Sequence, residues 1–166
     1  GDPLAGAKVV KQSYDILPDI VKGGGDGVHT PDMLTGGGVP AVQGWYATSA
    51  AAHVLDEPSV RPWVERFVAK MGKQPADYSI TYYDATQVIF DAIERVAKAG
   101  KPVNRANVRD AIQSTDLKTL QGDISFDANG DMKSKVVSIF QVNYDQSHPI
   151  GDVVHQFKYV GAAPEA

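Results

Sequence analysis

Four glycines around one acidic residue, Gly23-Gly24-Gly25-Asp26-Gly27, constrain the fold more than any other feature of the chain. The short apolar run Ile20-Val21 precedes them, and Thr30 and Pro31 follow with the character of an N-cap and a first helical residue. A strand that enters a glycine-rich turn and continues as a helix is typical of α/β proteins. The segment therefore predicts a β-to-α unit, with a short helix because Gly36-Gly37-Gly38 soon interrupts it.

Apolar residues at helical spacing predict four further helices. They are expected at residues 4–17, 59–71, 81–99 and 104–115. In the longest of them, Thr81 and Asp84 have the spacing of a capping box. The helix at 59–71 carries an apolar stripe through Phe67 and is expected to end at Gly72. We expect these two helices to pack on each other through their apolar stripes.

Alternating or continuous apolar runs predict strands toward both ends of the chain. They are expected at residues 42–48, 120–126, 136–142 and 153–160. The polar segment 127–131 is interpreted as a hairpin turn that joins the second and third of these strands. A helical middle between strand-rich ends indicates a chain that leaves one lobe, forms part of another and returns.

The composition excludes several classes of function. The 166 residues carry a formal net charge of -4 with scattered basic residues, which argues against a nucleic-acid partner. No run reaches the roughly 18 apolar residues that a membrane-spanning helix needs. The absence of cysteine excludes disulfides, thiolate metal sites and a cysteine nucleophile. Neither a metal site nor a catalytic triad is indicated by the spacing of the four histidines, which we expect on the surface or in loops: His29, His53, His148 and His155.

Two segments have both a structural and a functional interpretation. The glycine-rich turn fits neither the dinucleotide fingerprint nor the P-loop, so it is either a tight turn or a ligand-binding turn. Asp26 favours binding, because a carboxylate at the end of a strand can accept charge-assisted hydrogen bonds from an ammonium group. Tyr83 is either a core contact or a ring that stacks on an apolar ligand side chain. The 127–131 segment lacks the remaining ligands of a calcium loop and is interpreted as a turn.

Four segments form a recognisable series: Gly24-Gly25-Asp26-Gly27, Val42-Gln43-Gly44-Trp45-Tyr46-Ala47-Thr48, Tyr83-Asp84-Ala85, and Leu120 to Asp127 with Asn129-Gly130-Asp131. In this order they resemble the branched-chain amino-acid-binding proteins of ABC importers, which are periplasmic solute receptors of the leucine/isoleucine/valine type. The resemblance covers essentially the whole chain but only the C-terminal half of the family. It implies a fragment, or one piece of a cleaved protein. The implied fold class is α/β, type I periplasmic-binding-protein-like, with parts of two three-layer αβα lobes.

The resemblance also implies how the chain is divided between the lobes. Residues 1–48 would form a segment of the C-terminal lobe, and residues 49–117 a helical segment of the N-terminal lobe. Residues 118–166 would return to the C-terminal lobe. Two of the family's three crossovers would then have their hinges near Thr48 and Gly122.

A ligand site between the lobes is implied as well. Asp26, flanked by Gly25 and Gly27, would hold the ligand's α-ammonium group, and Tyr83 would contact the ligand side chain. The family's second aromatic residue falls at Gly1 or Asp2, where this sequence has none. The loops that hold the ligand carboxylate belong to the half that the chain does not cover.

The implied function is that of the substrate-binding component of an ABC transporter, with no enzymatic activity, no cofactor and no metal. Its partners would be a small-molecule ligand (an amino acid, an amide or an aromatic acid) and an ABC permease. Its location would be periplasmic, or extracytoplasmic with a lipid anchor, and an exposed apolar surface would favour self-association. Two alternatives stay open. One is a cytoplasmic ligand sensor on the same fold, and the other is an enzyme that uses the glycine-rich turn for a phosphorylated substrate, with His29 as its candidate base.

Overall fold

The computed structural model describes residues 3–163 and divides into two compact units. Unit 1 comprises the described residues up to His53 together with those from Val136 onward, and unit 2 is Val54–Lys135. The chain leaves unit 1 and returns to it, and the α/β class is confirmed. The sequence places the second change of lobe at 117/118, whereas the return to unit 1 follows Lys135. The difference arises because residues 116–125 form a separate hairpin instead of joining the sheet of unit 1.

Unit 1 is built on a four-stranded mixed sheet with the strand order β1-β2-β5-β6. Its strands are β1 (Gly23–Gly24), β2 (Tyr46–Ser49), β5 (Ser138–Val142) and β6 (Phe157–Ala162). β1 and β2 are parallel, whereas β5 is antiparallel to both β2 and β6. Ser49, the last residue of β2, pairs with Ser138, the first residue of β5. The carboxyl ends of β1 and β2 therefore lie at one edge of the sheet, beside the start of β5.

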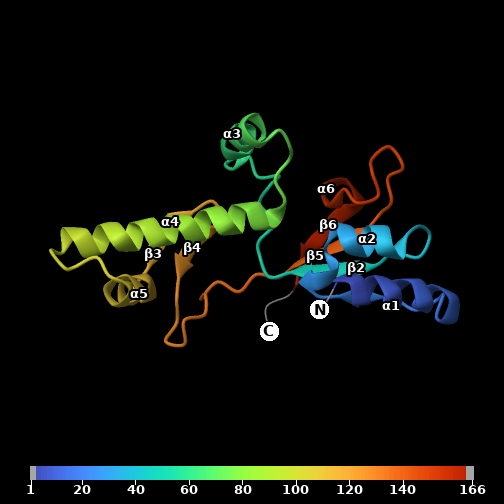
Figure 1. The fold of residues 1–166 in the computed structure, drawn as a ribbon, viewed down its shortest axis with the longest axis horizontal. Coiled ribbons are helices and arrows are strands. Elements are labelled where there is room, and N and C mark those ends of the chain that lie inside the picture. Colours follow the sequence, from blue (N-terminus) through green and yellow to red (C-terminus); the bar gives the residue numbers. More distant parts are fainter. Residues whose placement is uncertain (1–2, 164–166) are drawn as a thin grey trace. The chain divides into compact units, whose positions relative to one another are not determined.

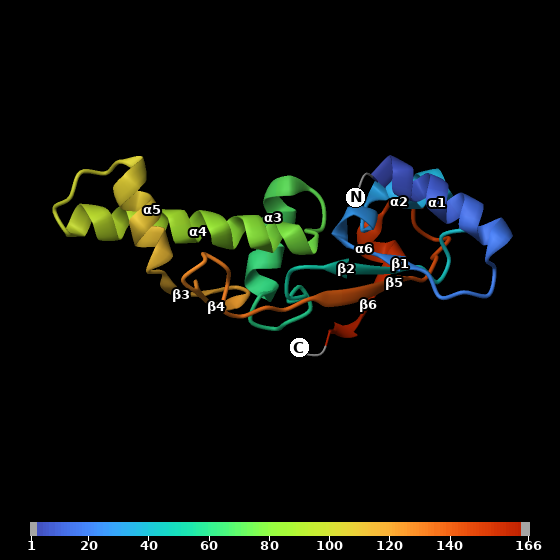
Figure 2. The same cartoon turned by 90° about the horizontal axis from the view of Figure 1, so that it is seen from below.

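Helices α1 (Pro3–Ile16) and α2 (Pro31–Gly37) lie on the same side of this sheet (Figure 2). The core that they bury consists of Val10, Met33, Leu34, Ala41, Val42, Trp45, Ala47, Phe140, Val142 and Phe157. Thr30 caps α2 as predicted, because its hydroxyl accepts the Met33 N–H at 3.2 Å. Close packing requires glycine at position 37, since a Cβ there would lie 2.7 Å from Cγ1 of Val42.

Three strand predictions in unit 1 are wrong in part. Ile20 and Val21 are exposed, and the strand begins only at Gly23. The segment before Tyr46 forms turns that carry the buried Trp45 into the core, so β2 begins later than predicted. Residues 153–156, expected to begin the last strand, form the short helix α6 (Val153–Gln156). At Trp45 and Val153 an apolar side chain packs into or against the core from a turn and from a helix, and this burial overrides local β propensity.

Unit 2 combines three helices with a two-stranded hairpin (Figure 1). The elements are α3 (Arg61–Met71), α4 (Asp77–Lys98), α5 (Arg105–Gln113), β3 (Asp116–Thr119) and β4 (Gly122–Ser125). Gly72 ends α3 in the left-handed conformation, as predicted. Helices α3 and α4 meet where Trp63 and Val60 pack with Ile80, one residue before the predicted start of the long helix at 81. No helix within residues 3–163 combines the length and the apolar character needed to cross a membrane.

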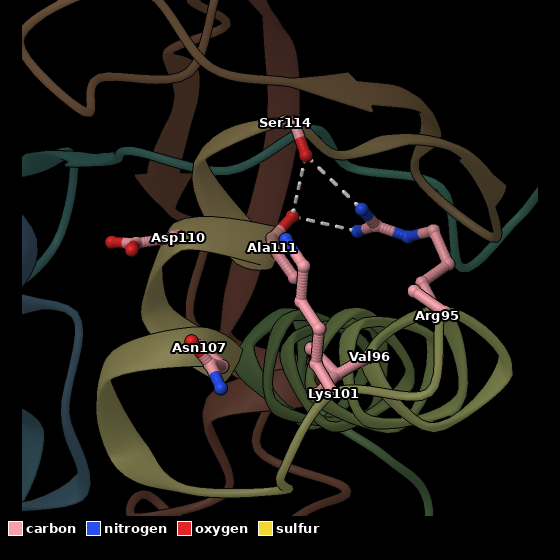
Figure 3. A pocket seen from close by; sticks show the side chains of 8 residues that line it. Arg95, Val96, Lys101, Asn107, Asp110, Ala111 and Ser114 are labelled. Atoms are coloured by element: carbon pink, nitrogen blue, oxygen red, sulfur yellow. Dashed lines mark hydrogen bonds between the residues drawn. The ribbon is translucent and has the colours of Figure 1, made fainter.

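Arg95 of α4 forms hydrogen bonds with the end of α5 (Figure 3). Its guanidinium donates hydrogen bonds to the Ala111 carbonyl at 2.8 Å and to the hydroxyls of Ser114 at 3.1 Å and Thr115 at 3.3 Å. The arginine Nε also donates to Asp91 at 2.7 Å, within α4. The Ala111 carbonyl also accepts the N–H and the hydroxyl of Ser114, so Arg95 joins a group of hydrogen bonds that stabilises the end of α5. The surface pocket beside it has a volume of about 240 Å³.

The predicted capping box at the start of the long helix is wrong. Helix α4 begins at Asp77, four residues before Thr81, so Asp84 lies in the helix interior. The hydroxyl of Ser79 instead accepts the Ala76 N–H at 3.2 Å and satisfies one donor at the helix start.

The predicted pairing across segment 127–131 is also wrong, although the turn itself is present. β4 pairs with β3, and beyond the turn the chain forms only an isolated bridge between Phe126 and Met132. The Asp127 carboxylate accepts the N–H groups of Asn129 at 2.8 Å and Asp131 at 3.0 Å, which holds the pKa of Asp127 below its usual value. A local turn signal therefore identified the turn but not the strands that pair around it.

Candidate functional site

The glycine-rich turn of unit 1 lies directly after β1, at the carboxyl edge of the parallel pair. Asp26 begins a single 3₁₀ turn, Asp26–Val28, in which Val28 N–H donates to the Gly25 carbonyl at 3.1 Å and His29 N–H donates to the Asp26 carbonyl at 2.9 Å. Asp26 is exposed there. Ligands of open α/β sheets bind outside the carboxyl ends of parallel strands, so this position suits a ligand-binding carboxylate.

The glycines of this turn have different steric roles. A Cβ at Gly24 would lie 2.8 Å from Cγ2 of Val28, so the fold itself requires glycine at that position. A Cβ at Gly25 would have open space within 4 Å, and its φ of -73° is available to any residue. The tight packing of the turn therefore depends on Gly24, which sequence reasoning did not separate from its neighbours. Gly25 leaves room for another group to approach the main chain.

His29 and His53 lie in loops, as expected, and their rings pack against aromatic rings of unit 1. His29, directly after the 3₁₀ turn, stacks on Phe140 with ring centroids 4.5 Å apart and meets Phe157 edge-on at 4.4 Å. His53 stacks on Tyr159 at 4.5 Å. This cluster could not be predicted from local patterns, because its members come from four separate segments that only the sheet brings together. Through His29, the cluster attaches the end of the Asp26–Val28 turn to the sheet residues Phe140 and Phe157.

Tyr83 lies in unit 2, on the first half of α4, and its side chain is 39% exposed. Its ring meets the buried Trp63 of α3 edge-on, with centroids 5.5 Å apart. Tyr83 borders a groove of about 560 Å³ that is lined by aromatic residues and by the cations Arg66 and Lys70. The structure thus presents a partly exposed aromatic ring at this position. Asp26 and Tyr83 belong to different units.

Sequence reasoning missed the role of Asp84, the neighbour of Tyr83. Its carboxylate is 1% exposed and accepts hydrogen bonds from the main-chain N–H groups of Leu120 at 3.3 Å and Gln121 at 3.0 Å. These two residues form the turn of the β3–β4 hairpin. Along α4, residues spaced by four form a row that is apolar except for Asp84, which stands between Ile80 and Val88. A single carboxylate in such a row would have been the sequence signal for a buried, hydrogen-bonded side chain.

The two candidate hinge residues lie inside regular elements. Thr48 is in β2, and Gly122 begins β4 with a φ of +108°, which favours glycine. The connections between the units follow each of them along the chain, at 53/54 and 135/136.

No group of three or more metal-ligating side chains gathers within residues 3–163. The other histidine pair is also engaged: the rings of His148 and His155 stack 3.7 Å apart and nearly parallel. Each Nδ1 is hydrogen-bonded to a carboxylate, that of Asp145 at 2.9 Å and that of Asp152 at 2.7 Å. Parallel rings do not direct two nitrogen lone pairs at one ion, so this cluster is a structural element of the 143–156 segment.

Comparison with known proteins identifies solved structures with the same fold. A leucine-binding protein, LivK, from Thermotoga maritima is 27% identical, with a TM-score of 0.75 over 98% of this chain and 42% of that protein. LivJ from Streptococcus pneumoniae, solved with isoleucine, is 19% identical with a TM-score of 0.64 over 97% of this chain and 43% of LivJ. A solute-binding protein from R. palustris, solved with benzoate, is 16% identical with a TM-score of 0.63 over 95% of this chain and 39% of that protein.

This chain thus spans about 42% of the length of the LivK structure that it matches. No curated protein sequence matches it. The family model described as periplasmic binding protein matches residues 12–148, which is most of the chain and includes both Asp26 and Tyr83. The fold is that of the type I periplasmic binding proteins, and the chain belongs to the periplasmic binding protein family.

Proposed function

We propose that this chain is part of the substrate-binding component of an ABC importer and that it contributes residues that hold a small amino acid. The observation that carries the proposal is the exposed carboxylate of Asp26 at the carboxyl edge of the β1–β2 pair. Membership of a family of solute-binding proteins supports a binding role without chemistry on the ligand. An ABC permease is the proposed partner, and an extracytoplasmic location follows from the same family.

The charge of Asp26 favours one ligand class over the others. A carboxylate attracts an ammonium group and forms charge-assisted hydrogen bonds with it. It repels a ligand whose only charge is a carboxylate or a phosphate. Among the relatives, two were solved with leucine or isoleucine and one with benzoate. Asp26 therefore supports an α-amino acid for this chain, in preference to an aromatic acid or a phosphorylated substrate.

Tyr83 is proposed to contact the ligand side chain, and Gly25 and Gly27 to let the ligand approach the main chain. The open space at the Gly25 Cβ position and the partial exposure of Tyr83 support these roles. Unit 1 is proposed to contribute to the C-terminal lobe and unit 2 to the N-terminal lobe. Thr48 and Gly122 stay our candidate hinges, with the connections at 53/54 and 135/136 as the segments that move on closure.

Calorimetric titration of the receptor-length protein tests the proposal. We expect leucine, isoleucine or another uncharged amino acid to bind, with no chemical change to the recovered ligand. Benzoate and inorganic phosphate serve as comparison ligands that carry a negative charge but no ammonium group. Binding of benzoate with no binding of any amino acid would contradict the proposed ligand class. Turnover of the ligand would contradict the binding role.

A further inference from the structure

The carboxylate of Asp84 is a buried charged group to which the proposed function assigns no role. It is almost fully buried, yet it lies outside the proposed contacts with the ligand. It accepts the Leu120 and Gln121 main-chain N–H groups and, at 3.2 Å, the side-chain amide of Gln121. A buried carboxylate is costly unless hydrogen bonds satisfy it, and here all the donors come from one two-residue turn.

A second contact strengthens this attachment. The hydroxyl of Thr81, one helical turn before Asp84, donates to Oε1 of Gln121 at 3.1 Å. The amide of Gln121 is therefore held at both of its ends by α4, through its oxygen by Thr81 and through its nitrogen by Asp84. These bonds hold the β3–β4 turn against the first half of α4, on the helix face that Thr81 and Asp84 share.

The rotation of α4 decides where Tyr83 lies. Successive residues of an α-helix are about 100° apart around its axis, so an inward Asp84 places its neighbour Tyr83 at the border of the exposed face. There the Tyr83 ring meets Trp63 edge-on, and Tyr83 stays partly exposed. Tyr83 also borders a second groove, between α4 and β3, that Asp84 and Leu120 help to line. The bonds of Asp84 and the orientation of Tyr83 are thus linked by the geometry of the helix.

We propose that Asp84 is a positioning residue for ligand recognition: by holding the Leu120–Gln121 turn, it fixes the orientation in which Tyr83 meets the ligand side chain. The contact between Tyr83 and the ligand rests on the proposed function. The orientation of the Tyr83 ring by Asp84 does not. Asp84 acts through Tyr83 and does not itself contact the ligand.

The test is a double-mutant cycle in the receptor-length protein, with leucine as the ligand and Asp84→Asn and Tyr83→Leu as the variants. Asparagine keeps the shape of the side chain but turns an NH₂ group toward N–H donors. We expect D84N to weaken leucine binding by about tenfold. In the Y83L background it should have no further effect. Additive losses would overturn the proposal, because they would show that Asp84 does not act through Tyr83. The matched control is Asp110→Asn, an exposed aspartate of the same unit, which should leave the affinity unchanged.

A readout without ligand separates this inference from the proposed function. A fluorine label on the Tyr83 ring reports its contact with Trp63 by NMR. We expect D84N to shift or broaden this resonance and D110N to leave it in place. An unmoved resonance in D84N would overturn the positioning role even if leucine binding falls. If the resonance moves while Y83L binds leucine normally, the orientation by Asp84 is supported and the ligand contact of Tyr83 is contradicted.

If D84N does not fold, Gln121→Ala tests the same attachment more mildly. It removes the bonds of the Gln121 amide to both Thr81 and Asp84 but keeps the two main-chain bonds. We expect a smaller loss of affinity and a smaller shift of the Tyr83 resonance. A Q121A protein with an unshifted resonance would contradict the proposal.

Discussion

Ser138 and Ala51 join the two places where the chain crosses between the units. The Ser138 hydroxyl donates to the Ala51 carbonyl at 2.6 Å and accepts the His53 N–H at 3.0 Å. His53 is the last residue of unit 1 before the chain leaves it, and Val136, close to Ser138, is the first after it returns. One buried hydroxyl therefore anchors both connections to the same edge of the sheet, within unit 1.

Replacing this hydroxyl should destabilise unit 1. In Ser138→Ala the Ala51 carbonyl and the His53 N–H lose a buried partner, which costs about 1–3 kcal/mol. Ser49 provides a matched control, because it pairs with Ser138 across the sheet, is equally buried, and has a hydroxyl with no hydrogen-bond partner within residues 3–163. Ser49→Ala should be neutral or slightly stabilising. Urea unfolding of both variants measures the difference, and equal losses would contradict the anchoring role.

The steric difference between Gly24 and Gly25 can be tested directly. Gly24→Ala brings a Cβ to 2.8 Å from a Val28 methyl group, so we expect a fall in stability and a displaced 3₁₀ turn. Gly25→Ala should fold normally, since its Cβ meets open space. If a ligand approaches the main chain here, G25A should weaken ligand binding without lowering the melting temperature. A G25A protein with full affinity would remove Gly25 from the site.

Asp145 predicts a pH dependence of the loop at residues 143–152. Hydrogen bonds from the hydroxyl and N–H of Ser147, and then from His148 Nδ1, hold the pKa of Asp145 well below its usual value. The ionised form is thus favoured by folding. Its contribution is complete above an unfolded pKa of about 4 and is lost as the pH falls through the lower folded pKa.

Asp145→Asn should therefore reduce the amide-exchange protection of this loop at neutral pH. The difference from the wild type should shrink toward zero in strong acid, because the wild-type carboxyl is then protonated as well. Asp15→Asn, at an exposed position of α1, controls for the loss of one negative charge. A difference that persists unchanged in acid would show that Asp145 acts by its shape and not by its charge.

The isolated chain should self-associate. Unit 2 exposes large apolar side chains along α4, among them Tyr82 at 75% and Phe90 at 59%. Single exposed apolar residues are common, but several on one helix favour association. Sedimentation should show oligomers that Phe90→Glu reduces, with Lys98→Glu as a control at an exposed charged position of the same helix. A monomer that binds no hydrophobic dye would contradict this expectation.

Local signals in the sequence were sufficient for the existence of α1 to α5 and for two of their caps. Thr30 caps α2 and Gly72 ends α3 because these residue types satisfy donors or permit a left-handed turn at helix ends. Burial along the helices was less predictable. Phe67, in the middle of the apolar stripe, is only half-buried, whereas Trp63 is buried. Which part of a stripe is covered depends on where the next helix crosses it.

Long-range pairing could not be predicted from local patterns. The turn at 127–131 was recognised, but β4 pairs with β3, and its expected partner β5 belongs to another sheet. Asp84 was assigned to a helix start because its spacing from Thr81 fits a capping box, while its real partners lie 36 and 37 residues away. For the candidate site, the sequence identified Asp26 and Tyr83 through a resemblance, and the structure added their local environments.

The most direct test of the account is the affinity of the receptor-length protein for leucine and for 4-methylpentanoate, its deaminated analogue, with and without Asp26→Asn. A lost charge-assisted hydrogen bond weakens binding by about 1.5–3 kcal/mol, or roughly 10- to 150-fold. We expect that loss for leucine and no loss for the analogue, with Asp32→Asn in the first turn of α2 as the control that changes neither. Unchanged leucine affinity in D26N, or an equal loss for leucine and the analogue, would contradict the role of Asp26 as the ammonium-binding residue.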